Sequence, residues 1–99
     1  MTLITLHGFI VKQPFSNQII NETKKYEFRN FKTLKLNIPI YLLSDGMVLG
    51  KIMFTDIKNN NKDWKYAWKI KVLKKLVKPW KYSHPQGAQR WVKKVNPAK

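Results

Sequence analysis

The sequence predicts a mainly β (α+β) fold: a small antiparallel β-barrel with one or two short helices. Short segments of alternating apolar and polar residues recur along the chain, turn-forming residues separate them, and a single early segment has helical spacing. Closing these strands into a barrel would remove exposed strand edges, which could otherwise pair between molecules.

The length of 99 residues allows one domain, which we expect to span residues 1–95, with a frayed tail at 96–99. Thirteen aromatic residues exclude a disordered polycation and indicate a core built from large rings. The chain has no cysteine and no apolar run near the roughly 20 residues of a membrane span. We therefore expect no membrane association and an intracellular, cytoplasmic location, or a nuclear one in a eukaryote.

The first two elements are a strand and a short helix. Residues 3–11 alternate loosely and are rich in Leu, Ile, Thr, Phe and Val, which predicts a strand. Pro14 suits the first turn of a helix because it lacks an N–H that would have no intrahelical partner. We expect this helix to end near Asn21 and to have an apolar face formed by Phe15, Gln18 and Ile19.

The segment from Lys24 to Phe31 is predicted to be the next strand. Side chains alternate between the two faces of a strand, so one face would be charged and the other mostly aromatic. The charged face would have Lys25, Glu27 and Arg29, and the other face Lys24, Tyr26 and Phe28.

A β-hairpin is predicted from Ile38 to Ile57. Strands at 38–43 and 47–57 flank Ser44–Asp45–Gly46, a turn of residues that tolerate positive φ. Gly50 within the second strand indicates a bulge or a close backbone approach. After an exposed connection at 58–63, strict alternation predicts a strand over 66–73, and a short apolar element surrounds Trp91 and Val92.

Short runs of residues in a fixed order along nearly the whole chain resemble a known family. They are Lys12–Gln13–Pro14–Phe15, Lys24–Lys25 before Glu27–Phe28–Arg29, Ile40–Tyr41 before Gly50–Lys51–Ile52, Tyr66–Ala67–Trp68, Pro79, and Gln86–Gly87 with Trp91. In this order they are similar to the ASCH domain of the PUA-like superfamily. The pattern Lys-x-x-Glu-x-Arg at Lys24, Glu27 and Arg29 is the most specific part of the resemblance.

The resemblance implies a PUA-like barrel with a cleft beside the strand of this pattern, and an association with RNA or other nucleic acid. Some relatives hydrolyse acetylated cytidine with a Lys at the position of Lys24 and a Thr where this chain has Glu27. Others are described as metal-dependent ribonucleases. The chain departs from the family at Glu27, which removes that nucleophile, at Glu22, where the family usually has Gly, and in its extra residues 88–90.

The net charge of +15 favours a polyanionic partner, because solubility of a small domain needs a charge of only about 2–8. Lysines alternate with aromatic residues over residues 62–94. Lysine attracts phosphate irrespective of base sequence, and aromatic faces accept stacked bases. Trp64 and Trp80 are the stacking candidates because each adjoins a lysine and lies next to a polar loop or a proline, whereas Trp68 and Trp91, which lie in apolar periodic context, are expected in the core.

The charged strand residues also suit nucleic acid without reference to the family. Glu27 could accept a hydrogen bond from the amine of a base while Lys24 or Arg29 holds a phosphate. The alternative is an ordinary ion pair on a solvated strand face, worth about 0–1 kcal/mol.

These observations predict a domain that binds RNA or single-stranded nucleic acid. The expected contact residues are Lys24, Lys25, Glu27, Arg29, Trp64, Trp80 and Arg90. One alternative is a hydrolase of the same fold, a nucleoside amidohydrolase or a ribonuclease, with Lys24 and Glu27 as catalytic residues. Another is a protein that binds an acidic protein partner. We expect no metal site and no cofactor, because the five acidic residues and two histidines form no ligand motif.

Overall fold

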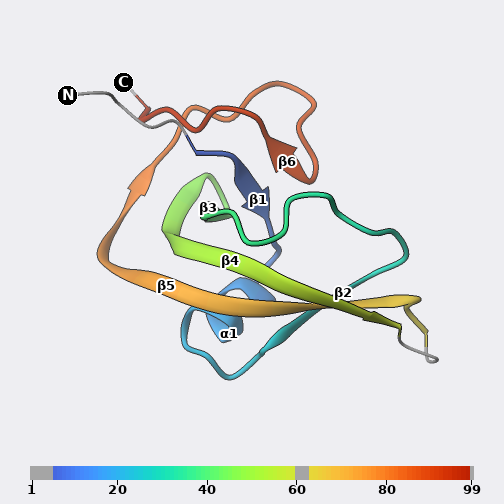
Figure 1. Ribbon diagram of the computed structural model, residues 1–99. Coiled ribbons are helices and arrows are strands. Elements are labelled where there is room, and N and C mark those ends of the chain that lie inside the picture. The colour runs from blue at the N-terminus through green and yellow to red at the C-terminus, as the bar shows by residue number, and fades with distance from the viewer. Residues whose placement is uncertain (1–5, 60–62, 99) are drawn as a thin grey trace.

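A computed structural model, which describes residues 6–59 and 63–98, shows a curled six-stranded sheet with one short helix (Figure 1). The elements are β1 (Gly8–Ile10), α1 (Phe15–Ile20), β2 (Tyr26–Arg29), β3 (Ile40–Ser44), β4 (Met47–Asn59), β5 (Tyr66–Lys81) and β6 (Trp91–Val92). The prediction of a mainly β fold is confirmed. Within these ranges, no helix has the length and hydropathy needed to cross a membrane.

The strands are ordered β2-β5-β4-β3-β1-β6, and the sheet curls into a half-barrel. Among the described strands, β2 and β6 are the two ends of this order. All neighbouring strands are antiparallel except β1 and β3, which are parallel. The prediction of an antiparallel barrel did not include this parallel pair. Parallel strands need a crossover connection, and here the chain between them contains α1 and β2. Of the strand predicted at 3–11, β1 covers residues 8–10, and residues 3–5 lie outside the described ranges.

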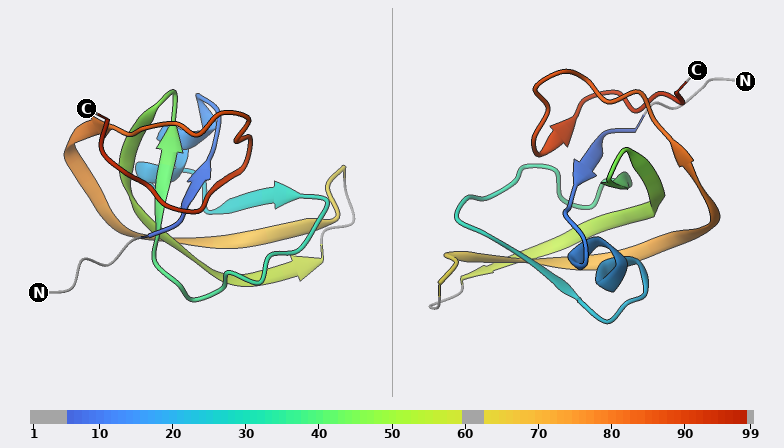
Figure 2. Two further views of the ribbon diagram at one scale, coloured as in Figure 1. Left: turned by 90° about the horizontal axis from the view of Figure 1, so that it is seen from above. Right: turned by 180° about the vertical axis from the view of Figure 1, so that it is seen from behind.

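The helix α1 forms where it was predicted but turns a different face toward the sheet. It packs beside β3 and β5 (Figure 2). Its buried residues are Ser16, Ile19 and Ile20. The predicted apolar face is therefore wrong for Phe15 and Gln18, which are exposed. A buried hydrogen bond from the Ser16 hydroxyl to the Ser44 hydroxyl, at 2.9 Å, joins the inner face of α1 to β3.

The predicted hairpin is confirmed as β3 and β4. Asp45 and Gly46 form the turn with φ angles of 51° and 77°. The pairing of β4 shifts register between Val48 and Gly50, which confirms the predicted bulge. A Cβ atom on Gly50 would overlap the carbonyl oxygen of Lys74, so the absence of a side chain lets β4 and β5 approach closely.

The strand β5 is much longer than the predicted strand at 66–73. It continues to Lys81 and bends around the sheet as Figure 1 shows, and it pairs with β4 up to Lys75 and again at Trp80 and Lys81, but not at residues 76–79. The continuation has no regular alternation and contains Pro79, so the local pattern did not indicate a strand there. Register shifts in the pairing of β4 with β5 accommodate this irregular stretch. The expected connection at 58–63 begins later along the chain, because β4 extends to Asn59; residues 60–62 lie outside the described ranges.

Two groups of buried residues form the core. The larger contains Phe9, Val11, Ile19, Ile20, Ile40, Leu42, Ile52, Phe54 and Trp68. The smaller contains Leu43, Val48, Tyr82, Val92 and Val95. Trp68 is fully buried, as predicted, and its ring centroid lies 5.6 Å from that of Phe9 and 5.1 Å from that of Phe54. Trp91 is partly buried and packs against the larger group.

The C-terminal segment that we expected to be frayed is paired through Ala98. The Ser83 N–H donates to the carbonyl of Asn96 at 2.8 Å, and the Ala98 N–H donates to the carbonyl of Lys81 at 3.0 Å. These bonds connect residues 96–98 to the end of β5, so this part of the predicted tail belongs to the folded domain.

Candidate functional site

The strand β2 turns its charged residues inward. It pairs with β5 so that Glu27 lies opposite Trp68 and Arg29 lies opposite Tyr66. Glu27 is 7% exposed, whereas Phe28, which points the other way, is exposed. The prediction that Glu27 and Arg29 share a face is confirmed, and the alternative of an ion pair on a solvated face is wrong because Glu27 is buried.

Glu27 and Arg29 form a loose ion pair with unused hydrogen-bonding capacity. Arg29 Nη2 lies 3.7 Å from Glu27 Oε2, and the Phe28 N–H donates to Glu27 Oε1 at 3.2 Å. The guanidinium carbon of Arg29 lies 4.8 Å from the centroid of the Phe9 ring. Among the described residues, nothing hydrogen-bonds to the buried Glu27 Oε2 or Arg29 Nε. A buried polar atom without a partner costs about 1–3 kcal/mol, so both groups favour an additional partner.

A cavity of about 340 Å³, here called the main cavity, adjoins this ion pair. Residues from β1, α1, β2 and the segments before β5 and β6 line it. They are Ile10, Val11, Lys12, Phe15, Glu27, Phe28, Arg29, Trp64 and Gln89. Trp64 is 47% exposed and Phe15 is similarly accessible, so two large rings border the opening and remain available to a ligand.

A smaller hollow of about 160 Å³, here called the side pocket, places Lys24 next to the main cavity. The two hollows share Phe15, Glu27, Phe28 and Trp64. The Lys24 amine donates to the carbonyl of Tyr26 at 2.6 Å and lies 4.7 Å from the centroid of the Phe28 ring. Burial lowers the pKa of Lys24; nearby Glu27 acts in the opposite direction, and Arg29 lowers this pKa further.

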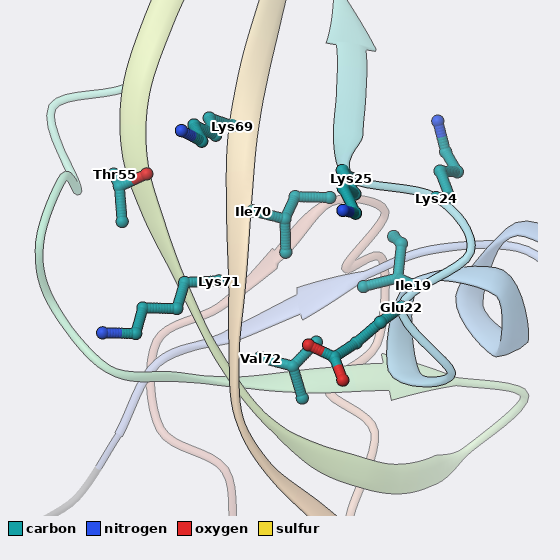
Figure 3. A pocket seen from close by; sticks show the side chains of 9 residues that line it. All are labelled: Ile19, Glu22, Lys24, Lys25, Thr55, Lys69, Ile70, Lys71 and Val72. Atoms are coloured by element: carbon teal, nitrogen blue, oxygen red, sulfur yellow. The ribbon is translucent and has the colours of Figure 1, made fainter.

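The structure brings together some of the predicted contact residues and not others. Lys24, Glu27, Arg29 and Trp64 surround the main cavity and the side pocket. Lys25 lies next to them and lines a different hollow along β5, which Figure 3 shows.

Trp80 and Arg90 line neither hollow. Trp80 packs edge-on against Tyr41, at 5.6 Å between ring centroids, and adjoins the smaller core group. Trp80 therefore does not border a base held in the main cavity. The guanidinium carbon of Arg90 lies 4.6 Å from the centroid of the Phe31 ring, while the preceding residue, Gln89, lines the main cavity.

Sequence reasoning missed Phe15, Phe28 and Gln89 as site residues. Phe15 was assigned to the buried face of the helix, and Phe28 was placed on the strand face opposite Glu27. Phe28 borders the side pocket because β2 is an end strand, where side chains of either face can reach the rim, and Phe15 borders it from the exposed face of α1. Their signal in the sequence is that both belong to the quoted runs, Lys12–Gln13–Pro14–Phe15 and Glu27–Phe28–Arg29.

The backbone at Glu22 has a φ of 62°, in the left-handed region that favours glycine. Glu22 is exposed and lines the same hollow along β5 as Lys25.

No protein-family model matches the chain, and no curated protein has a matching sequence. In the described part of the chain, no three His, Asp or Glu side chains gather closely enough to hold a metal ion. The function of the protein is therefore inferred from its own residues.

Proposed function

We propose that the protein binds single-stranded nucleic acid, RNA in particular, and holds one base in the main cavity. The observation that carries this proposal is a buried ion pair, Glu27 with Arg29, which retains unpartnered polar atoms and belongs to two residues that line a cavity together with the accessible rings of Trp64 and Phe15. The volume of the cavity, about 340 Å³, is within the usual range for small-ligand sites.

The edge of a nucleobase complements this ion pair. A base such as cytosine or adenine carries an amino group beside a ring nitrogen, that is, a donor beside an acceptor. Glu27 supplies the acceptor for the amino group, and Arg29 supplies a donor. Trp64 and Phe15 offer faces for stacking, which contributes about 1–3 kcal/mol per base.

A single strand fits the site better than a duplex does. A base enters a cavity of this kind only when it is unstacked and unpaired, as bases are in RNA loops and ends. Lys12 and Lys24 lie at the border of the two hollows and can neutralise the adjoining phosphates. The net charge of +15 adds attraction that does not depend on base sequence.

Replacing Trp64 with Ala is expected to weaken binding of a short RNA by roughly 5- to 150-fold, the equivalent of one lost stacking contact. The measurement is fluorescence anisotropy with labelled RNA trinucleotides at low salt. Trp64→Phe, which keeps a ring, is the matched control and should retain most of the affinity. Because Trp64 is half exposed, neither change should alter the fold. Absence of binding by the unaltered protein, or equal affinity of the Ala variant, would contradict the proposal.

A hydrolase is the second candidate, and the position of Lys24 favours it. A general base must lose its proton to act, and burial beside Phe28 lowers the pKa of Lys24 toward that requirement. Glu27 lines the same side pocket and could act as a second acid–base group. The substrate would be an acylated nucleoside or an RNA phosphodiester.

Replacing Lys24 with Met is expected to leave stability at pH 7 equal to or above that of the unaltered protein. In the unfolded chain the Lys24 amine has its ordinary pKa of 10.5, and in the folded protein its pKa is lower. The unfolded state therefore holds the proton more tightly, so the charged amine opposes folding below both pKa values. This opposition disappears as the pH rises through the folded pKa toward 10.5.

Urea unfolding of Lys24→Met between pH 7 and 10.5 measures this effect, with the exposed neighbour variant Lys25→Met as control. The stability advantage of Lys24→Met over the unaltered protein should shrink as the pH rises.

The same variant separates the two candidate functions in an assay with acetylated cytidine and labelled RNA. A hydrolase would show turnover that Lys24→Met abolishes, whereas a binding protein would show none in either form. In the unfolding experiment, a marked loss of stability of Lys24→Met at pH 7 would contradict the conclusion that the buried, charged Lys24 amine opposes folding.

A further inference from the structure

A second concave surface lies along β5, apart from the main cavity. Two hollows of about 380 and 410 Å³ adjoin each other and share Glu22 and Val72. We call this surface the lysine groove. The residues that line it are Ile19, Ile20, Asn21, Glu22, Lys24, Lys25, Thr55, Lys69, Ile70, Lys71, Val72, Leu73, Lys74 and Lys75. Figure 3 shows the first hollow, with Lys69 and Lys71 directed to one side of β5 and Ile70 and Val72 directed to the other, toward Ile19 and Glu22.

The lysine groove carries a large excess of positive charge. Six of its residues are lysines and one is a carboxylate, Glu22. None of these lysines forms an ion pair with a described carboxylate, since the ion pair found joins Glu27 to Arg29. Asp56 is opposite Lys69 in the sheet, but its carboxylate accepts a hydrogen bond from the Ile57 N–H at 2.9 Å. The charge of these amines is therefore not neutralised by a described carboxylate, although the Lys24 amine donates to the carbonyl of Tyr26 and the Lys75 amine donates to the side chain of Asn21.

The lysine groove is continuous with the proposed base site through Lys24. This residue lines both the groove and the side pocket, and the side pocket shares four residues with the main cavity. In Figure 3 the Lys24 amine points away from the hollow while its stem stays at the rim. A ligand that extends from the main cavity would meet Phe28 and Lys24 at the rim of the first hollow, and Lys69 and Lys71 lie across β5 from Lys24.

We propose that the lysine groove binds the phosphodiester backbone of the same single strand whose base occupies the main cavity. This inference rests on the proposed function and adds the path of the strand. Residues two apart on a β-strand lie about 6.6 Å apart, a distance comparable to that between neighbouring phosphates of an extended single strand. Lys69 and Lys71 have this spacing on β5. The continuity with an aromatic-bordered cavity favours a nucleic acid over an acidic polypeptide.

The test compares labelled RNAs of three and twelve nucleotides in anisotropy titrations over a range of salt concentrations. The groove variant is Lys69→Gln with Lys71→Gln. The matched control is Lys93→Gln with Lys94→Gln, which removes the same charge from exposed residues next to β6, at the opposite end of the strand order from β2. For the twelve-nucleotide RNA, the slope of log K against log salt should decrease in magnitude by about 1.4 in the groove variant, at about 0.7 per lost phosphate contact.

The control variant and the three-nucleotide RNA should show a much smaller change in slope. Glu22→Gln is a further variant, and it should bind the twelve-nucleotide RNA more tightly because it removes a carboxylate from the groove. Misfolding would weaken binding and so cannot produce this result. If the groove variant and the control variant reduce the salt slope equally, the proposal that the groove binds the backbone is contradicted. In that case, weaker binding of the three-nucleotide RNA by Trp64→Ala would still support the base site. If the unaltered protein binds neither RNA, the proposed function itself is contradicted. Binding of a labelled oligoglutamate with the same sensitivity to the groove variant would assign the groove to an acidic protein.

Discussion

Replacing Trp68 with Ala is expected to reduce the free energy of unfolding by about 3–5 kcal/mol, the usual cost of removing a large buried ring. Trp68 is fully buried and packs against Phe9, Phe54 and Phe31 at 5.1 to 5.6 Å between ring centroids. Its indole N–H also donates to the carbonyl of Phe31 at 3.1 Å. A domain of this length has only about 5–15 kcal/mol of stability, so the loss would leave a large fraction of the protein unfolded at moderate temperature.

Urea unfolding followed by far-UV circular dichroism measures this effect, and Trp64→Ala is the control. Trp64 is the same residue type but is 47% exposed, so its removal should cost far less. A loss below about 1 kcal/mol for Trp68→Ala would show that the ring is not the centre of the core. Because Trp68 lies opposite Glu27 on the neighbouring strand, the same substitution should also disturb the base site.

Replacing Gly50 with Ala is the second change with a large expected effect. The new Cβ atom would overlap the carbonyl oxygen of Lys74 and lie 2.6 Å from Cδ1 of Ile20. The Ile20 side chain can rotate, but the carbonyl belongs to the backbone of β5 and must move with the strand. Overpacking of this kind costs about 1–3 kcal/mol or more.

Gly46→Ala is the matched control for Gly50→Ala in urea unfolding. Gly46 has a φ of 77° and no atom within 4 Å of the position of a Cβ, so its replacement introduces backbone strain without a clash. Gly50→Ala should be the more destabilising of the two, and it should displace Lys74 in the lysine groove while the main cavity keeps its shape. A cost for Gly50→Ala no larger than that for Gly46→Ala would contradict the close approach of β4 and β5.

Features set by local chemistry could be predicted from the sequence. Asp45 and Gly46 tolerate positive φ, so the hairpin of β3 and β4 could be placed from its turn alone. Gly50 indicated the bulge because glycine in a strand usually marks one. Features set by distant contacts could not be predicted. The parallel pairing of β1 with β3 and the extension of β5 to Lys81 depend on which strands become neighbours.

The candidate site was predictable in part for the same reason. Alternation along β2 placed Glu27 and Arg29 on one face, but alternation cannot tell which face is buried. Trp64 and Trp80 have similar local sequences, each beside a lysine, and yet one borders the main cavity and the other packs on Tyr41. The difference arises from the course of β5, which begins after Trp64 and bends before Trp80.

The place of β2 at one end of the sheet has a consequence for how the site behaves in solution. Among the described strands it is hydrogen-bonded to β5 alone, so its outer backbone edge lacks a second strand. Segments held on one side separate from a fold at lower free energy than central strands do. A molecule that touches both Glu27 and Gln89 in the main cavity would connect β2 to the segment just before β6, the strand at the other end of the sheet order. Binding of such a molecule would therefore slow the local opening of β2.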